Sequence, residues 1–170
     1  MMYARYALYA PLSLGFNIFV ILFSPLLAGY VAIANNPHPS WMRWCYSDDD
    51  DIFGSGMTKE PVPGTVWGRF KRALWWLCRN PGFGFAKNVI GRPNPCTIYM
   101  LERSTFPEWD SGTPTIERFV AVTEDGRRWF NYRRDVPLPM SKYCKLWFGW
   151  QDDGRLKIMF NPFLTSRGNQ

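Results

Sequence analysis

The segment "LSLGFNIFVILFSPLLAGYVAIA" (residues 12–34) decides how the first third of the chain folds. No Asp, Glu, Lys or Arg occurs between Arg5 and Arg43, and the segment itself is apolar apart from two serines and one asparagine. A transmembrane helix needs about 20 such residues to cross a hydrocarbon layer of about 30 Å. The segment therefore predicts one membrane span, with a kink at Pro25.

Three other interpretations of residues 12–34 stay open. A hairpin turning at Ser24-Pro25 would enter the membrane and return, although each leg has only about 12 residues and is too short to span. A secretory signal peptide would end after Ala34, although the apolar stretch is longer than the usual core of about 7–15 residues. A buried helix of a soluble core usually keeps a polar face, and this segment has none.

Aromatic residues flank the predicted span, as they do at membrane–water interfaces. They are Tyr3, Tyr6 and Tyr9 before it, and Tyr30, Trp41 and Trp44 around its end. Lys and Arg are scarce before the span and dense after it, especially from Arg69 onward. Because loops rich in Lys and Arg stay in the cytoplasm, we expect the C-terminal part of the chain there. The four cysteines would be free thiols in that compartment, although an even number also permits two disulfides.

Residues 35–64 are predicted to form a connector, because they contain the breakers "NNPHPS" and "PVPG". The connector also carries the four consecutive aspartates Asp48–Asp51. A calcium loop needs alternating acidic positions and a distal Glu, and this run has neither. We interpret it as a solvated loop, and we expect no metal and no cofactor.

Residues 65–92 begin with a helix predicted over "TVWGRFKRALWWLCRN" (65–80), in which Thr65 caps the start and Asn80-Pro81-Gly82 stops the helix. Apolar residues at helical spacing form one stripe, and basic residues and tryptophans lie off it. This pattern favours an amphipathic helix on anionic lipid headgroups. A helix packed on the downstream sheet and a contact with nucleic acid are the alternatives. The residues expected at the membrane interface are Trp41, Trp44, Trp67, Arg69, Lys71, Arg72, Trp75, Trp76 and Arg79.

Residues 93–170 are predicted to form a small antiparallel β-domain of four or five strands, because the apolar period changes to two. Hairpin turns are expected at Glu124-Asp125-Gly126 and Asp152-Asp153-Gly154. The residues expected to share one core face include Phe119, Ala121, Trp129, Leu146, Phe148, Leu156 and Ile158. With residues 1–34 as the anchor, the predicted fold class is α+β.

Catalytic patterns are absent from the sequence. His38 is the only histidine, and no common nucleophile, phosphate-loop or zinc motif occurs. The net charge of +6 points instead to an anionic partner. The candidate anion-binding residues are Arg127, Arg128, Arg133 and Arg134, for which an ordinary solvated face is the alternative. We therefore expect a protein that is not an enzyme.

Two stretches, "WWLCRNPGFGFAKNVIG" and "KLWFGWQDDGRLKIMFNPF", together with the proline inside the apolar segment, resemble an uncharacterised family of small proteins from tailed bacteriophages and prophages. The first motif is carried by Trp76, Arg79, Asn80, Pro81, Gly84, Phe85 and Gly91. The second is carried by Phe148, Gly149, Trp150, Asn161, Pro162 and Phe163. Phe148 and Gln151 stand where that family has Leu and Lys. The resemblance implies phage origin and association with the host membrane, and it implies no activity.

The combined expectation is a non-enzymatic phage protein anchored in the host inner membrane, with its β-domain in the cytoplasm. Its expected partners are the anionic lipid surface and a host or phage protein, and its role would be envelope remodelling or recruitment. One alternative is a virion component inserted into the envelope during genome delivery. Another is a soluble nucleic-acid-binding protein. A further alternative is an enzyme acting on lipid or phosphate substrates through the arginine cluster, and the lack of any acid/base pair argues against it.

Overall fold

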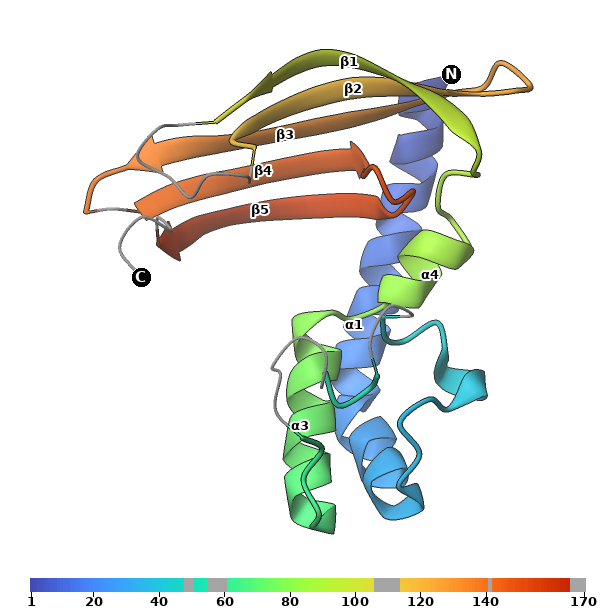
Figure 1. Ribbon diagram of the computed structural model, residues 1–170, viewed down its shortest axis with the longest axis vertical. Helices are drawn as coiled ribbons and strands as arrows, with labels where there is room; N and C mark the ends of the chain where they lie inside the picture. Colours follow the sequence, from blue (N-terminus) through green and yellow to red (C-terminus); the bar gives the residue numbers. More distant parts are fainter. Residues whose placement is uncertain (48–50, 55–60, 106–113, 141, 166–170) are drawn as a thin grey trace. The chain divides into compact units, whose positions relative to one another are not determined.

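The computed structural model describes residues 1–47, 51–54, 61–105, 114–140 and 142–165, and it divides into two compact units (Figure 1). The sheet unit consists of residues 1–10 and 92–170, and the helical unit of residues 11–91. The predicted α+β class is confirmed: a long apolar helix precedes a five-stranded antiparallel sheet. The sheet unit thus includes the first ten residues of the chain, which precede the helical unit.

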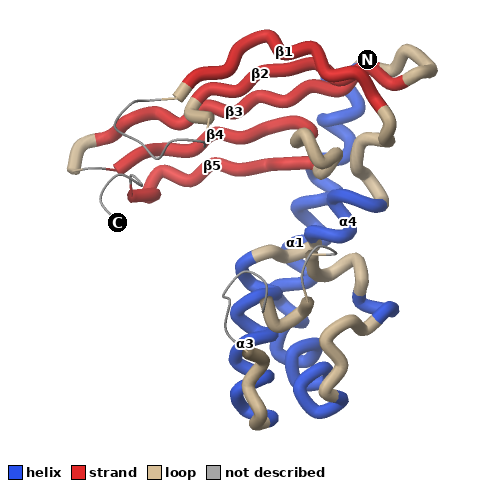
Figure 2. Tube along the Cα trace, in the orientation of Figure 1, coloured by secondary structure: helices blue, strands red, loops and turns tan. Residues whose placement is uncertain are grey.

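The sheet is an antiparallel meander in which each strand pairs with the next along the chain (Figure 2). Its strands are β1 (Cys96–Ser104), β2 (Ile116–Thr123), β3 (Arg128–Leu138), β4 (Lys142–Trp150) and β5 (Leu156–Thr165). The two predicted hairpin turns join β2 to β3 and β4 to β5. Gly126 and Gly154 adopt positive φ of 77° and 87° there, a conformation that glycine reaches without strain.

The strand register separates the predicted core residues onto two faces. Phe119 and Ala121 share a face with Trp129, because β2 pairs Ala121 with Trp129. The β3–β4 pairing places Asn131 opposite Gly149, so the even-numbered residues Leu146 and Phe148 lie on the other face. Leu156 and Ile158 lie on this same face, since they pair with Trp150 and Phe148. The expectation of one shared face was wrong, because a shift of one residue in register inverts every side chain of a strand.

The helical unit is built on α1 (Met2–Ala34), η1 (Ser40–Met42), α3 (Val66–Arg79) and α4 (Phe83–Asn88). α3 runs antiparallel to α1: Arg69 Nε donates to the Ala32 carbonyl at 3.0 Å, and Cys78 Sγ lies 3.4 Å from Ser24 Oγ. Their facing sides form a core with residues 42–46 and 52–53, in which Val20, Met42, Phe53, Trp76 and Leu77 are buried. The helix predicted over 65–80 is confirmed, including the cap, since Thr65 Oγ1 accepts from Gly68 N–H.

α1 continues through Pro11 and Pro25 without interruption. A proline removes the N–H that would bond the carbonyl four residues earlier. For Pro25 this carbonyl belongs to Ile21, and Ser24 Oγ donates to it at 2.7 Å. The serine hydroxyl thus replaces the missing backbone donor, which keeps the apolar helix intact.

The first ten residues of α1 pack on the sheet. Tyr6 donates its O–H to the Lys157 carbonyl at 3.0 Å, and the rings of Tyr3 and Phe130 lie 4.9 Å apart. The Arg5 guanidinium lies 4.3 Å from the ring centre of Trp129. Tyr3 and Tyr6, which were expected at a membrane interface, thus contact the sheet.

Candidate functional site

The surface of α1 within the helical unit is apolar. Ten large hydrophobic side chains between residues 12 and 33 are exposed, with exposed fractions of 71%, 72% and 76% at Leu22, Leu26 and Ile33. We call this set the apolar arc, because at 3.6 residues per turn it covers roughly half of the helix circumference. The apolar arc consists of Leu12, Leu14, Ile18, Phe19, Ile21, Leu22, Phe23, Leu26, Tyr30 and Ile33.

The inward side of α1 carries polar side chains. Ser13 and Ser24 are buried among Val20, Ala28 and Val31. Among the described helices, α1 alone has the length and composition to cross a membrane, and 28% of its most apolar window is buried. A core helix of a soluble protein is mostly buried, with its apolar side inward. α1 therefore exposes large apolar side chains that a helix of a soluble core would bury.

The outward side of α3 alternates aromatic and cationic side chains. Trp67, Lys71, Trp75 and Arg79 are exposed. Lys71 Nζ lies 5.9 Å from the Trp67 ring centre, and the Arg79 guanidinium lies 5.1 Å from that of Trp75. Amphipathic rings beside cations are typical of helices that lie in a lipid headgroup layer.

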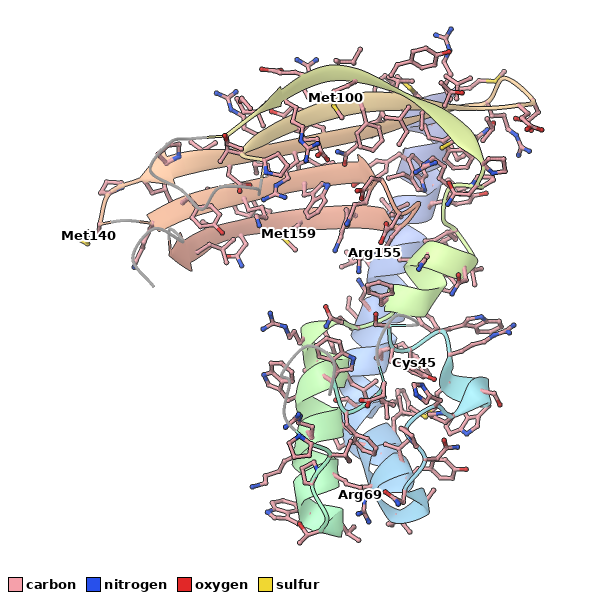
Figure 3. The ribbon with its side chains drawn as sticks, in the orientation of Figure 1. Cys45, Arg69, Met100, Met140, Arg155 and Met159 are labelled. Atoms are coloured by element: carbon pink, nitrogen blue, oxygen red, sulfur yellow. The ribbon has the colours of Figure 1, made fainter. Side chains whose placement is uncertain are left out.

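The other predicted interface residues have mixed positions. Trp41 and Trp44 are exposed. Trp76 is buried beneath Gly54, whose Cα leaves no room for a side chain above the indole. Arg69 (Figure 3) donates to the Ala32 and Gly64 carbonyls, and Arg72 donates to the Phe53 carbonyl, so both arginines bind the helical unit together.

Glycines of the first family motif permit close packing. Gly82 adopts φ of 62°, and a Cβ on Gly84 would lie 2.0 Å from the Arg43 carbonyl oxygen. Asn80 caps the end of α3, and Phe85 stacks on Phe16 with ring centres 4.4 Å apart. Pro81 and Gly91 are partly buried. These positions have structural roles.

The second motif lies in β4 and β5. Trp150 is fully buried, and its ring contacts Tyr6 and Trp129 edge-to-face. Gly149 adopts φ of 99° against the Phe130 carbonyl. Asn161 and Pro162 are partly buried on β5, and the Phe163 side chain lies outside the described set.

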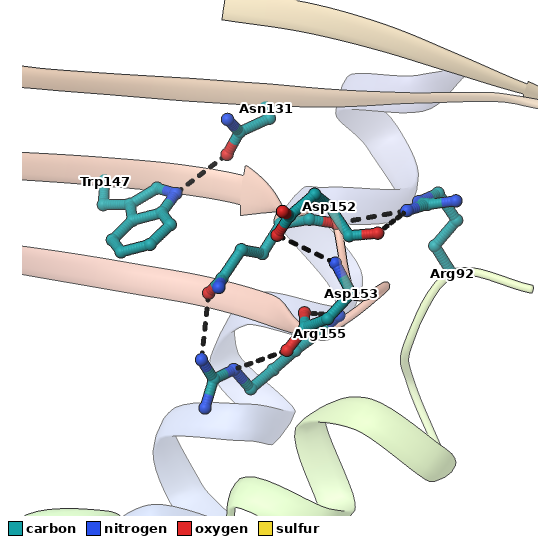
Figure 4. Close-up of polar contacts among 7 residues, drawn as sticks. Arg92, Asn131, Trp147, Asp152, Asp153 and Arg155 are labelled. Atoms are coloured by element: carbon teal, nitrogen blue, oxygen red, sulfur yellow. Dashed lines mark hydrogen bonds and ion pairs between the residues drawn. The ribbon is translucent and has the colours of Figure 1, made fainter. Parts of the chain in front are cut away.

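A second candidate surface is the face of the sheet formed by the odd-numbered residues of β2 to β5, which we call the polar face. Its centre is a hydrogen-bonded chain across three strands. Trp147 Nε1 donates to Asn131 Oδ1 at 2.8 Å (Figure 4). Asn131 Nδ2 in turn donates to Glu117 Oε1 at 2.8 Å. Burial raises the pKa of Glu117, and the nearby arginines Arg103 and Arg133 partly oppose this shift. The chain fixes the plane of the Trp147 indole.

Cations lie on both sides of Trp147. The Arg133 guanidinium and Lys157 Nζ are 4.9 Å and 5.1 Å from its ring centre. Arg133 is 6% exposed and donates to Asp135 Oδ2 at 3.1 Å, while Lys145 is buried on the next strand. The polar face is therefore rich in positive charge, with carboxylates in the minority.

The four arginines predicted as an anion site do not lie together. Arg127 pairs with Asp125 at the β2–β3 turn, and Arg128 is exposed beside it. Arg133 and Arg134 lie five to six residues further along β3, about 17–20 Å at the rise of a strand. The side chain of Arg133 lies on the polar face and is buried, whereas that of Arg134 is exposed on the opposite face. Of the four arginines, only Arg133 therefore joins Lys145 and Lys157 in the group of cations on the polar face.

Sequence reasoning missed Arg92, which is buried and holds the β4–β5 turn. Its guanidinium donates to the carbonyls of Gln151 and Asp152 (Figure 4). The backbone N–H of Arg92 donates to the Gly154 carbonyl at 2.7 Å. Arg155 completes the turn by bonding Gln151 Oε1 at 3.0 Å. No local pattern marks Arg92, because its partners lie about sixty residues away.

The predicted aspartate loop lies mostly outside the described residues, which include only Asp51. Asp51 Oδ1 accepts from Phe53 N–H at 2.7 Å and so shapes a turn. Among the described residues, no three His, Cys, Asp or Glu side chains gather into a group that could hold a metal ion. The four cysteines are free thiols.

Lys157 gives the sheet unit a predicted pH dependence. Burial lowers its pKa to about 7, helped by Arg155, Lys145 and Arg133 and opposed by Asp153. The unfolded chain thus binds more protons than the folded chain between pH 7 and the ordinary lysine value of 10.5. We expect the unfolding temperature to rise from pH 7 to pH 9 and this rise to be reduced in Lys157→Met, as measured by circular dichroism. An equal rise in the variant would contradict the assignment to Lys157.

The fold and these surfaces define a small α+β protein with an outward apolar helix and a cationic sheet face. A family model covers residues 1–167, and the chain belongs to this family, described as a family of unknown function (DUF7338). No curated protein and no solved structure matches the chain.

Proposed function

We propose that the protein is a membrane-bound interaction protein without catalytic activity, and the apolar arc of α1 is the observation that carries this proposal. In water, the hydrophobic effect places apolar side chains inside and polar ones outside. α1 has Leu22 and Leu26 outside and Ser13 and Ser24 inside. Patches of this size on soluble surfaces mark contacts with membranes or proteins.

The energy available from the apolar arc favours lipid. Burying a Leu, Ile or Phe side chain is worth about 1.5–3 kcal/mol when it is fully transferred from water. Ten side chains that are about half exposed would together contribute on the order of 10 kcal/mol. This exceeds the energy with which a single acyl chain holds a protein at a membrane.

The position of residues 1–10 bears on the topology in the membrane. They pack on the sheet, so they lie on the same side of any membrane as strands β1 to β5. One crossing by α1 would place residue 35 on the opposite side. The chain would then have to cross again before Arg92.

A second crossing between residues 35 and 91 is unfavourable. This interval contains seven Lys/Arg residues, and α3 alone carries Arg69, Lys71, Arg72 and Arg79. A charged side chain at the centre of a bilayer costs about 2.5–3.5 kcal/mol. We therefore infer that α1 and α3 lie together in one leaflet, with the apolar arc in the acyl layer and the outward side of α3 among the headgroups. This monotopic arrangement replaces the single span expected from the sequence.

The setting of the protein rests on the resemblance to phage proteins. It supports a location at the cytoplasmic leaflet of a host inner membrane, with the sheet unit presented to a host or phage partner. Free thiols at all four cysteines agree with a reducing compartment.

Tags at both ends of the full chain test the proposal. After expression in bacteria, we expect the protein in the membrane fraction after a carbonate wash. Protease should remove both tags in inverted vesicles and neither tag in spheroplasts. Removal of one tag from each side would contradict the monotopic arrangement and restore a single crossing. Full-length protein in the soluble fraction would overturn the membrane proposal itself.

A further inference from the structure

The polar face of the sheet concentrates positive charge at one place. Arg133 on β3, Lys145 on β4 and Lys157 on β5 approach one another closely enough for the other two to lower the pKa of Lys157. The groups facing Lys157 are these cations, Arg155 and Asp153 from the preceding turn, and the ring of Trp147. Arg133 pairs with Asp135 and Arg155 with Asp153, and Lys145 and Lys157 add further positive charge to the same surface. Like charges at close range disfavour one another, and such clusters are typical of sites that bind an anion.

Polar atoms in this cluster have no protein partner. Arg133 is 6% exposed and Asp135 is 3% exposed, and they share one hydrogen bond. Arg133 Nε and Asp135 Oδ1 are buried without a hydrogen-bond partner. A buried donor or acceptor left unpaired costs about 1–3 kcal/mol, so such atoms are expected where a ligand supplies the missing bond.

Next to this cluster, the indole of Trp147 forms a flat aromatic surface. Trp147 is partly exposed, and its plane is fixed by the bond to Asn131. Lys157 on β5 and Arg133 on β3 lie on either side of the indole. Met159 pairs with Trp147 on the same face (Figure 3).

We propose that the polar face binds a phosphate-type oxyanion, with Arg133 and Lys157 as its principal donors. Arg133 Nε would donate to one ligand oxygen, and the Lys157 ammonium would neutralise the charge. Asp135 Oδ1 is an acceptor, so it would accept a hydrogen bond from a ligand O–H. The favoured ligand is thus an anion that carries its own O–H, as hydrogen phosphate and phosphates with a neighbouring hydroxyl do. This inference rests on the sheet unit alone and does not depend on the membrane proposal.

Inorganic phosphate and sulfate are the probes that test the site, with the full chain purified in detergent and studied by calorimetry and tryptophan fluorescence. Sulfate has the same shape as phosphate but carries no proton at pH 7. We expect saturable binding of phosphate and at least tenfold weaker binding of sulfate. Absence of saturable phosphate binding would overturn the proposal, and equal affinities would overturn the role of Asp135.

Two neighbouring arginines on one strand provide matched variants. Arg133→Met should abolish phosphate binding, and Arg134→Met, on the opposite face, should leave it unchanged. Because loss of Arg133 leaves Asp135 buried without its partner, Lys157→Met is the second variant. It should weaken phosphate binding at least tenfold while raising the unfolding temperature, since it removes a buried charge. Equal losses in Arg134→Met and Lys157→Met would overturn the site.

Binding to lipid vesicles distinguishes a lipid headgroup from a free phosphate as the ligand. If the ligand is a lipid headgroup, inorganic phosphate should compete with phosphatidylglycerol vesicles for the wild-type chain, and Lys157→Met should reduce vesicle binding. If the ligand is a free phosphate, phosphate binding should depend on Lys157 and vesicle binding should not. Either pattern supports the site and names its ligand. Vesicle binding that depends on Lys157 without any response to phosphate would overturn it.

Discussion

Replacing both Leu22 and Leu26 by lysine is expected to release the protein from membranes. These side chains lie one turn apart in the apolar arc and are 71% and 72% exposed. Two lysines at the centre of a bilayer would cost about 6 kcal/mol, and half of that at the shallower depth of an interfacial helix still lowers partition by more than about 100-fold. Fractionation of cells and flotation with vesicles measure the effect.

The control places the same two charges on the sheet unit. Leu138 and Met140, at the end of the β3–β4 hairpin (Figure 3), are exposed hydrophobic residues that the membrane proposal leaves in water. Leu138→Lys with Met140→Lys should leave the membrane fraction unchanged. If the Leu22 and Leu26 substitutions left it unchanged too, the apolar arc would not be the membrane contact.

Gly149→Ala is expected to destabilise the sheet unit by about 2–6 kcal/mol. Gly149 has φ of 99°, and a Cβ there would lie 2.1 Å from the Phe130 carbonyl oxygen on β3. This oxygen belongs to the backbone of the paired strand, so it cannot move without disturbing the β3–β4 ladder. Backbone strain and crowding each cost about 1–3 kcal/mol, against a total stability of about 5–15 kcal/mol.

Gly126→Ala separates the two contributions. Gly126 has φ of 77°, but no atom lies within 4 Å of the position that a Cβ would occupy, so only the backbone strain is introduced. Denaturant titrations followed by circular dichroism should show a loss of about 1 kcal/mol for this variant. Equal losses in both variants would show that the close approach of Gly149 to Phe130 contributes nothing.

Local signals predicted the elements well. Thr65 and Asn80 bound α3 as expected, and the Asp-Gly turns lie where the sequence places them. The faces of the sheet could not be predicted in the same way, because they depend on register. The β3–β4 connection contains Pro139 rather than an Asp-Gly signal, and its length alone decides that Phe148 and Trp129 lie on opposite faces.

The candidate site was predictable only in its composition. Arginines on β3 were visible as a cluster in the sequence, but the alternation of a strand separates Arg133 from Arg134. Lys157 was not singled out, since its neighbours come from β3 and β4. The packing of Tyr6 on the sheet has no local signal either, because its partner is at the other end of the chain.

That packing has a consequence for the order of folding during synthesis. The hydrogen bond from Tyr6 to the Lys157 carbonyl joins residues 151 positions apart. At about 5–20 residues per second, residue 6 leaves the ribosome many seconds before its partner exists. During that interval the aromatic side chains at the start of α1 are exposed to solvent or contact another surface. The sheet can pack against them only after β5 has been synthesised. A translation arrest before β5 would therefore leave the start of α1 without its native partners.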